Sequence, residues 1–210
     1  MLFTYLKIAI RNLVRYKSFS IINIAGLTIG LCCTLFIALW VRDELSYDTF
    51  HADGDRIYRV NSHLSEADIK AAVTSPALAE AMRQEIPGVE DAIRISMPYK
   101  ALMQAGDRKF EESRIYYADA NFFRFFSFEL VKGDPAHALA VPENIVLSEA
   151  TAMKYFGTID VLGRTIRNLD ENKDLTISGV VRNTPHTSHL QFDFIKPMSF
   201  LARTNDEIRN

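Results

Sequence analysis

The feature that most limits how this chain can fold is an uncharged run of 24 residues, from Ser18 to Val41. As an α-helix the run would be about 36 Å long, against about 30 Å for the hydrocarbon core of a bilayer, and a soluble core helix rarely needs so long an apolar run. A cleavable signal peptide has an apolar core of about 7–15 residues and then a small-x-small cleavage site, whereas this run is longer and Trp40–Glu44 offers no such site. The run therefore predicts an uncleaved transmembrane helix, which we assign to residues 18–44.

Small residues recur at every fourth position of the predicted span, at Gly26, Gly30, Thr34 and Ala38. Because lipid tails provide no hydrophobic drive for helix association, contact between spans depends on close approach of their backbones. A single G-x-x-x-G is a weak motif, and small residues occurring in a span by chance are the alternative explanation. The extension over four steps favours a helix-packing face, and Asn23 near the inner end could hydrogen-bond to another helix.

The segment before the run, residues 1–17, has the pattern of a basic amphipathic helix. Apolar residues from Leu2 to Val14 share one stripe. A second stripe is basic and consists of Lys7, Arg11, Arg15 and Lys17. Because basic amphipathic helices of this kind lie along the membrane surface, we expect an interfacial helix in contact with the lipid of the inner leaflet. We expect its elbow near Asn12 or Ser18–Ser20; a straight extension into the cytoplasm is the alternative.

The distribution of charge predicts how the span is oriented. The four basic residues of the first 41 positions have no acidic neighbour there, which leaves 20 basic and 26 acidic residues in the rest of the chain. The positive-inside rule then places the N-terminus in the cytoplasm and the residues from about 45 onward on the outer side. The acidic outer part gives no electrostatic reason to expect nucleic-acid binding.

Residues 45–210 alternate between strand and helix patterns and predict an α+β domain. The stretch NIVLSEATAMKYFG indicates a strand and then a helix that is capped at Ser148 and ends at Gly157. Another helix is predicted between Ser75, as its N-cap, and Pro87. A division of this domain into two lobes stays open.

The chain lacks the motifs of the common catalytic and metal sites. It contains no G-x-x-x-x-G-K-[ST] phosphate loop, so it cannot itself be an ATPase of that class, and no G-x-S-x-G, H-E-x-x-H or C-x-x-C. Cys32 and Cys33 are adjacent within the span and point about 100° apart on a helix, so they indicate neither a disulfide nor a metal pair. His186 and His189 are close in sequence, but no carboxylate or thiol accompanies them at ligand spacing. We therefore assign no catalytic residue, no metal ligand and no cofactor-binding residue, and we expect no enzyme.

A dense group of phenylalanines stands out in the outer part: Phe122, Phe123, Phe125, Phe126 and Phe128. The group could form an apolar substrate surface. Because aromatic side chains dominate the cores of domains, we expect instead a helix-to-strand segment that packs in the core.

Several segments together resemble the MacB/FtsX-type permeases of ABC transporters. They are YDTFHADGDRIYRV, DANFFRFFSFELVKGDPAHAL, IVLSEATAMKYFG, DVLGRTI and SGVVRNTPHTSHLQFDF, in the family's order and over nearly the whole chain. The resemblance implies that residues 45–210 form most of a MacB-like periplasmic core domain, on the bacterial inner membrane. It also implies a dimeric permease, whose partners are a second permease copy and a cytoplasmic ABC ATPase subunit. ATP would be bound by that subunit, and no cofactor by this chain.

Two departures from the family pattern bear on function. The chain starts at the elbow helix without a fused ATPase, and no stretch after Asp193 is long enough to span a membrane. We therefore expect the N-terminal part of a longer permease, whose movement is driven by ATP hydrolysis in the partner and exports or extracts a substrate on the outer side. The competing hypothesis is a single-pass anchored binding or sensor module. No residue pattern indicates which substrate is moved.

Overall fold

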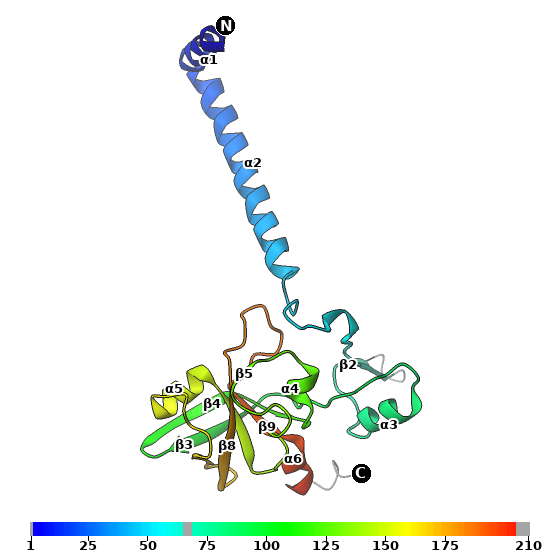
Figure 1. The fold of residues 1–210 in the computed structure, drawn as a ribbon. Coiled ribbons are helices and arrows are strands. Elements are labelled where there is room, and N and C mark those ends of the chain that lie inside the picture. The colour runs from blue at the N-terminus through cyan, green and yellow to red at the C-terminus, as the bar shows by residue number, and fades with distance from the viewer. Residues whose placement is uncertain (1, 65–68, 205–210) are drawn as a thin grey trace. The chain divides into compact units, whose positions relative to one another are not determined.

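The computed structural model describes residues 2–64 and 69–204. The chain divides into two compact units, which we call the helical unit (Met1–Tyr47) and the sheet unit (Asp48–Asn210). The sheet unit contains both helices and strands (Figure 1). The structure thus confirms the predicted fold class, a mixed helix-and-sheet domain that follows an N-terminal apolar helix.

The helical unit consists of α1 (Leu2–Arg15) and α2 (Lys17–Glu44). Tyr16 separates the two helices, with φ −108° and ψ 57°. The Tyr16 N–H still donates to the Asn12 carbonyl at 3.0 Å, and the Tyr16 carbonyl accepts the Ser20 N–H at 3.0 Å. The elbow therefore lies between the two places that the sequence indicates, and the bend keeps the backbone hydrogen bonds on either side of it.

Among the described residues, seven strands form one sheet: β3 (Tyr99–Ala105), β4 (Arg108–Ala118), β5 (Leu130–Gly133), β6 (Asn144–Ser148), β7 (Thr165–Asn168), β8 (Lys173–Val181) and β9 (Phe194–Pro197). Their order is β5-β8-β6-β9-β4-β3-β7. Since β7 pairs with β8 as well as with β3, six of the strands close into a ring, and β5 lies outside the ring on β8. The β4–β9 and β6–β8 pairs are parallel, and the other pairs are antiparallel. Closure leaves the ring itself without the two edge strands that an open sheet would have.

The sheet has a hydrophobic core on each face. On β6, Ile145 and Leu147 belong to the first core and Val146 to the second, because successive residues of a strand point to opposite faces. The first core draws on all six ring strands, on α5 (Glu149–Phe156) and on α6 (Met198–Thr204). The second core confirms the packing role predicted for the phenylalanine group, since four members are buried and one is partly buried: Phe122, Phe123, Phe126 and Phe128, with Phe125 packed against them.

The predicted strand-then-helix signal is confirmed at β6 and α5. Ser148 is the N-cap of α5, and its hydroxyl accepts the Thr151 N–H at 3.2 Å. Gly157 ends the helix in the left-handed conformation, with φ +71°. The residues immediately before and after α5 thus determine where the helix begins and ends.

The prediction of Ser75 as an N-cap is wrong. The helix α3 (Leu78–Glu85) follows Ala77, and no side chain caps it. Because Ser-Pro also favours the start of a turn, Ser75 begins a turn before the helix, in which its carbonyl accepts the Leu78 N–H at 3.1 Å. The remaining elements are short: η1 (Gly54–Arg56), α4 (Phe122–Phe125), and the strands β1 (Ser62–Leu64) and β2 (Ile69–Ala71), which form a separate antiparallel pair.

Gly133, at the end of β5, is the most crowded of the described glycines. Its φ is +98°, and an added Cβ would lie 2.5 Å from the Ser178 carbonyl oxygen. We expect Gly133→Ala to lower the free energy of unfolding by about 3 kcal/mol, from left-handed strain and this clash together. Gly157→Ala is the matched control, because Gly157 has φ +71° but no neighbour within 4 Å. Urea unfolding followed by circular dichroism measures both variants, and equal losses would contradict the clash.

Candidate functional site

The predicted packing face lies on α2. Within the part of the chain that the structure describes, α2 is the one helix long and apolar enough to cross a membrane (Figure 1). It contains no buried residue. At about 100° per residue, each four-residue step turns by about 40°, so small residues at this spacing form a slowly winding stripe. Viewed down the helix axis, Asn23 points in the same direction as the middle of this stripe. The helix thus brings five residues to one side: Asn23, Gly26, Gly30, Thr34 and Ala38.

Nothing within the described chain explains the two glycines of this face. A Cβ added to Gly26 or to Gly30 would meet no atom within 4 Å. Glycine in a helix interior is about 1 kcal/mol less favourable than alanine. The two glycines thus make the helix less stable, and no contact within the described chain requires them. Close approach by another helix gives such residues a use.

The polar side chains of α2 differ in how they are satisfied. Thr28 Oγ1 donates to the Ile24 carbonyl at 2.7 Å, and Thr34 Oγ1 donates to the Gly30 carbonyl at 2.9 Å. The Asn23 side chain, in contrast, has no hydrogen-bond partner among the described residues. Because an unpaired amide is costly in an apolar environment, Asn23 is the residue of this face that gains most from a second helix.

Three of the four predicted basic residues lie together on α1, and the fourth does not. Lys7, Arg11 and Arg15 follow one another at four-residue steps, and their side chains are exposed. Lys17 is instead the first residue of α2. The Arg15 guanidinium lies 5.9 Å from the centre of the neighbouring Tyr16 ring. Contact of this basic face with lipid stays a prediction.

A buried ionic cluster lies in the sheet unit. The Lys196 side chain on β9 is 0% exposed, and its Nζ donates to Glu171 Oε2 at 2.6 Å and to Tyr117 Oη at 3.0 Å. Tyr117 Oη donates in turn to Glu171 Oε1 at 2.7 Å. The ammonium also lies 4.0 Å from the centre of the Phe200 ring, and Tyr99 stacks on Tyr117 with 5.1 Å between ring centres. The cluster joins β3, β4 and β9 to the turn between β7 and β8.

Burial dominates the pKa values of this cluster. It lowers the pKa of Lys196, and the hydrogen bond and charge of Glu171 oppose that shift. It raises the pKa of Tyr99 and of Tyr117 well above the ordinary value. The hydrogen bond from Tyr117 to Glu171 raises the pKa of Tyr117 further, because it is made by the protonated phenol.

We expect the sheet unit to lose stability as the pH rises above about 10, the ordinary pKa of tyrosine. Above that pH the unfolded chain releases protons that Tyr99 and Tyr117 keep when folded, so the free energy of unfolding falls by up to about 1.4 kcal/mol per pH unit for each. The lowered pKa of Lys196 makes the free energy of unfolding rise with pH instead, because the unfolded lysine holds its proton longer. This effect ends at about pH 10.4, the ordinary pKa of lysine. Urea unfolding over this alkaline range measures the slope. Tyr117→Phe should flatten it, and an unchanged slope in that variant would contradict the assignment.

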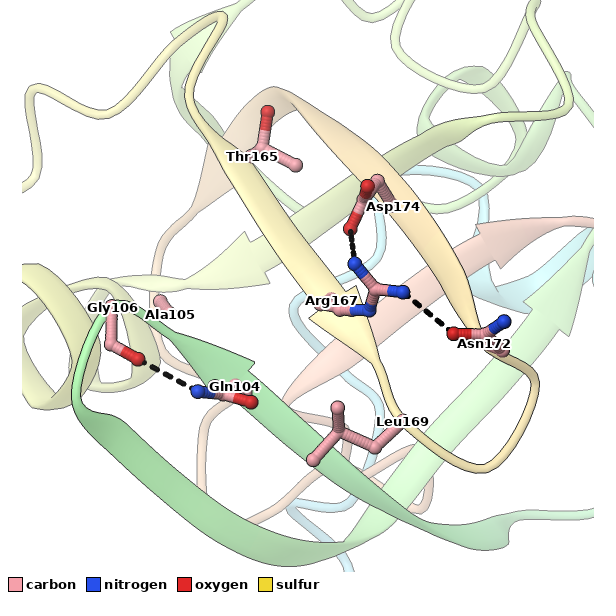
Figure 2. Close-up of a pocket in the computed structure, with 8 residues that line it drawn as sticks. All are labelled: Gln104, Ala105, Gly106, Thr165, Arg167, Leu169, Asn172 and Asp174. Carbon is pink, nitrogen blue, oxygen red and sulfur yellow. Dashed lines mark hydrogen bonds and ion pairs between the residues drawn. The ribbon is translucent and has the colours of Figure 1, made fainter.

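A polar pocket of about 550 Å³ opens where β3 and β7 diverge (Figure 2). Arg167 Nη1 lies 3.5 Å from Asp174 Oδ1, and Arg167 Nη2 donates to Asn172 Oδ1 at 2.6 Å. Gln104 Nε2 donates to the Gly106 carbonyl at 2.9 Å. The charged side chains of the pocket therefore pair with each other. Its lining consists of Gln104, Ala105, Gly106, Thr165, Arg167, Leu169, Asn172 and Asp174.

His186 and His189, which are close in sequence, lie in an exposed loop, where Nδ1 of His189 lies 2.6 Å from Asp48 Oδ2. Across the described ranges, no group of three His, Cys, Asp or Glu side chains is placed to hold a metal ion. The cysteines of α2, Cys32 and Cys33, are exposed and unbridged. These residues therefore form no chemical site with the packing face or with the ionic cluster.

Lys196 and the buried His51 are polar residues that sequence reasoning misses. Lys196 does carry a signal, because it is the lone charged residue in the stretch FIKPM, whose residues are all buried. A lysine inside a buried strand needs a partner, so this pattern predicts a hidden acid without naming it. His51 lies in a turn-rich stretch and has no comparable signal.

Comparison with known proteins identifies the family. Residues 20–209 match the sequence profile of the MacB-like periplasmic core domain. The chain belongs to this family. In the MacB-like chain, the matched segment begins near the start of α2 and runs through the whole described part of the sheet unit.

Solved structures share this fold. The MacB-like chain is 30% identical to a domain assigned to a permease protein of Porphyromonas gingivalis, with a TM-score of 0.59, over 68% of this chain and 64% of that one. The periplasmic region of MacB from Actinobacillus actinomycetemcomitans has the same fold, with a TM-score of 0.50 at 14% identity, over 64% of this chain and 59% of that one. The chain therefore spans less than two-thirds of the length of either structure. A search of curated proteins finds no significant match.

Proposed function

We propose that this MacB-like chain acts as a permease subunit of an ABC transporter of the MacB/FtsX type. ATP hydrolysis by a cytoplasmic partner moves the permease helices, and the movement reaches the sheet unit, which exports or extracts a substrate on the outer side. The partner binds the ATP, and this chain binds no cofactor. The observation that carries the proposal is the family match over residues 20–209, because it joins the candidate membrane helix and the sheet unit in one family segment.

The short connection between the two units supports coupling. Leu45–Tyr47 alone separate α2 from the sheet unit in sequence. The Leu45 N–H donates to the Val41 carbonyl at 2.9 Å, and the Ser46 N–H donates to the Asp43 carbonyl at 3.0 Å. These two bonds continue from the end of α2, so few residues separate the candidate membrane helix from the sheet unit.

The two faces of the helical unit define the proposed partners. The stripe of Gly26, Gly30, Thr34 and Ala38 packs against a second permease copy, since such stripes allow close contact between spans. The basic face of Lys7, Arg11, Arg15 and Lys17 contacts anionic lipid of the inner leaflet. The N-terminus is cytoplasmic, the sheet unit is periplasmic, and the membrane is the bacterial inner membrane; the acid-free first 41 residues support this orientation.

Affinity purification of the full-length protein from its native membrane tests the proposed function. An ABC ATPase is expected to co-purify, and the complex is expected to hydrolyse ATP. Substitution of the phosphate-loop lysine of that ATPase should abolish both hydrolysis and transport, because residues 1–210 contain no phosphate loop and the proposal assigns ATP binding to the partner. Recovery of the chain without any ATPase would favour the anchored sensor instead.

Alkaline phosphatase fused after Arg59 reports the orientation, because the enzyme is active only on the outer side. The fusion is expected to be active. A fusion after Lys17, before the span, is the control and should be inactive. The opposite pattern would overturn the orientation.

A further inference from the structure

The segment that follows α2 is fastened to the rest of the sheet unit at two places. Asp48 adopts φ +55°, its N–H donates to the Thr187 carbonyl at 2.8 Å, and its carboxylate accepts the His189 N–H at 3.1 Å. The second place is the turn at residues 126–128. We call residues 48–52 the attachment segment.

His51 forms the centre of the second fastening. It is 8% exposed, and its Nδ1 accepts the backbone N–H of Ser127 at 3.2 Å. A backbone N–H can only donate, so Nδ1 must be unprotonated and the imidazole neutral. Aromatic rings surround the imidazole with ring centres 4.0 to 5.2 Å away: Phe50, Phe126 and Phe128.

A second hydrogen bond depends on the same turn. The Ala52 N–H donates to Ser127 Oγ at 2.8 Å, so the turn and the attachment segment exchange two bonds, and His51 accepts one of them. The Phe50 ring adds apolar contact with Phe128, at 5.4 Å between ring centres. Loss of the His51 acceptor would therefore remove one of the two hydrogen bonds that hold the attachment segment to this turn.

Few charges act on His51. Burial lowers the pKa of His51, and the charge of Asp48 opposes that shift. The turn at residues 126–128 carries no charged side chain. The charged groups that flank the contacting segments form pairs of their own: Arg124 with Asp91, Glu129 with Arg182, Asp53 with Arg56, and His189 with Asp48.

We propose that His51 is a proton-operated release for the attachment segment. While the imidazole is neutral, Ser127 is bonded and the segment stays fastened to the turn. A proton on Nδ1 removes the acceptor and makes the His51 N–H face the Ser127 N–H. It also places a cation in a buried site, so the segment leaves the turn. Control of transport through this release rests on the proposed function, whereas the release itself does not.

Hydrogen–deuterium exchange of the full chain in detergent micelles tests the release. The protection factor of the Ser127 amide is expected to fall about tenfold per pH unit from about pH 6.5 down to the lower pKa of the attached state, because the released state binds one more proton. His51→Asn keeps an acceptor that cannot titrate, so its Ser127 amide should stay protected at every pH. His51→Phe keeps a ring without an acceptor, so its Ser127 amide should be unprotected at every pH.

His137→Asn is the matched control, because the His137 side chain is 78% exposed, and this variant should behave as the wild type does. A Ser127 amide whose protection is independent of pH in the wild type would overturn the proposal. So would a wild-type pH dependence in His51→Asn, which would show that a group other than His51 controls the release. The measurement needs neither ATPase nor cargo, so failure of the proposed function would not change its outcome.

Discussion

Replacing both Gly26 and Gly30 with leucine is expected to weaken the association of α2 with its partner helix. An added Cβ at either position meets no atom of the described chain, and leucine forms helices better than glycine does, so α2 itself should fold as well as before. The new bulk lies where the partner backbone must approach, and close packing is the main source of helix association in lipid. We expect a loss of more than about tenfold in the dimer equilibrium, which corresponds to about 1.4 kcal/mol.

Cross-linking through Thr34→Cys, in a chain whose Cys32 and Cys33 are serine, measures this contact in membranes. The control places two leucines on the opposite side of α2, by Ala25→Leu and Cys32→Leu, at about 160–180° from the middle of the stripe. This control should cross-link as the parent does. Unchanged cross-linking in the glycine double variant would show that the stripe is not the contact.

Replacing Glu171 with glutamine is expected to lower the free energy of unfolding by about 3 kcal/mol. The Lys196 ammonium is fully buried, and Glu171 is the carboxylate that neutralises it, at 2.6 Å. Removing one partner of a buried ion pair leaves an uncompensated charge in a poorly solvated site. Urea unfolding followed by near-ultraviolet circular dichroism, which reports on the buried tyrosines, measures the loss.

The reverse change, Lys196→Met, is expected to be nearly neutral or stabilising. The Glu171 side chain is 27% exposed, so water can solvate its carboxylate once the lysine is gone, and Tyr117 still donates to it. Methionine fills most of the space of the lysine stem and needs no desolvation of charge. If the two variants lose equal stability, packing of the lysine stem rather than charge pairing holds the cluster together.

The parts of the fold that could be predicted are those whose signals are local. The caps of α5 are the residues immediately before and after the helix, so Ser148 and Gly157 predict its ends correctly. Ser75 fails because a Ser-Pro pair fits both the N-cap of a helix and the start of a turn, and the structure has the turn, with α3 beginning at Leu78. The elbow at Tyr16 carries neither glycine nor proline, so no backbone signal marks it.

The candidate site divides in the same way. A helix converts four-residue spacing into a face, so the stripe on α2 can be read directly from the sequence. Lys196 and His51 depend on Glu171 and Ser127, which are 25 and 76 residues away in the chain. Only ring closure and the packing of the attachment segment bring these pairs together. The polarity of a single residue can indicate that a partner exists, but not which residue it is.

The position of β9 determines how the sheet unit would bear a pulling force. Tension on Asp48 passes to Thr187 and His189, in the loop that leads to β9. β9 is bonded on both sides, parallel to β4 and antiparallel to β6. Drawing it out would require two ladders to shear at once, whereas an edge strand can be peeled one bond at a time. Under tension, the unit would therefore yield at its point of attachment before any strand of the ring is lost.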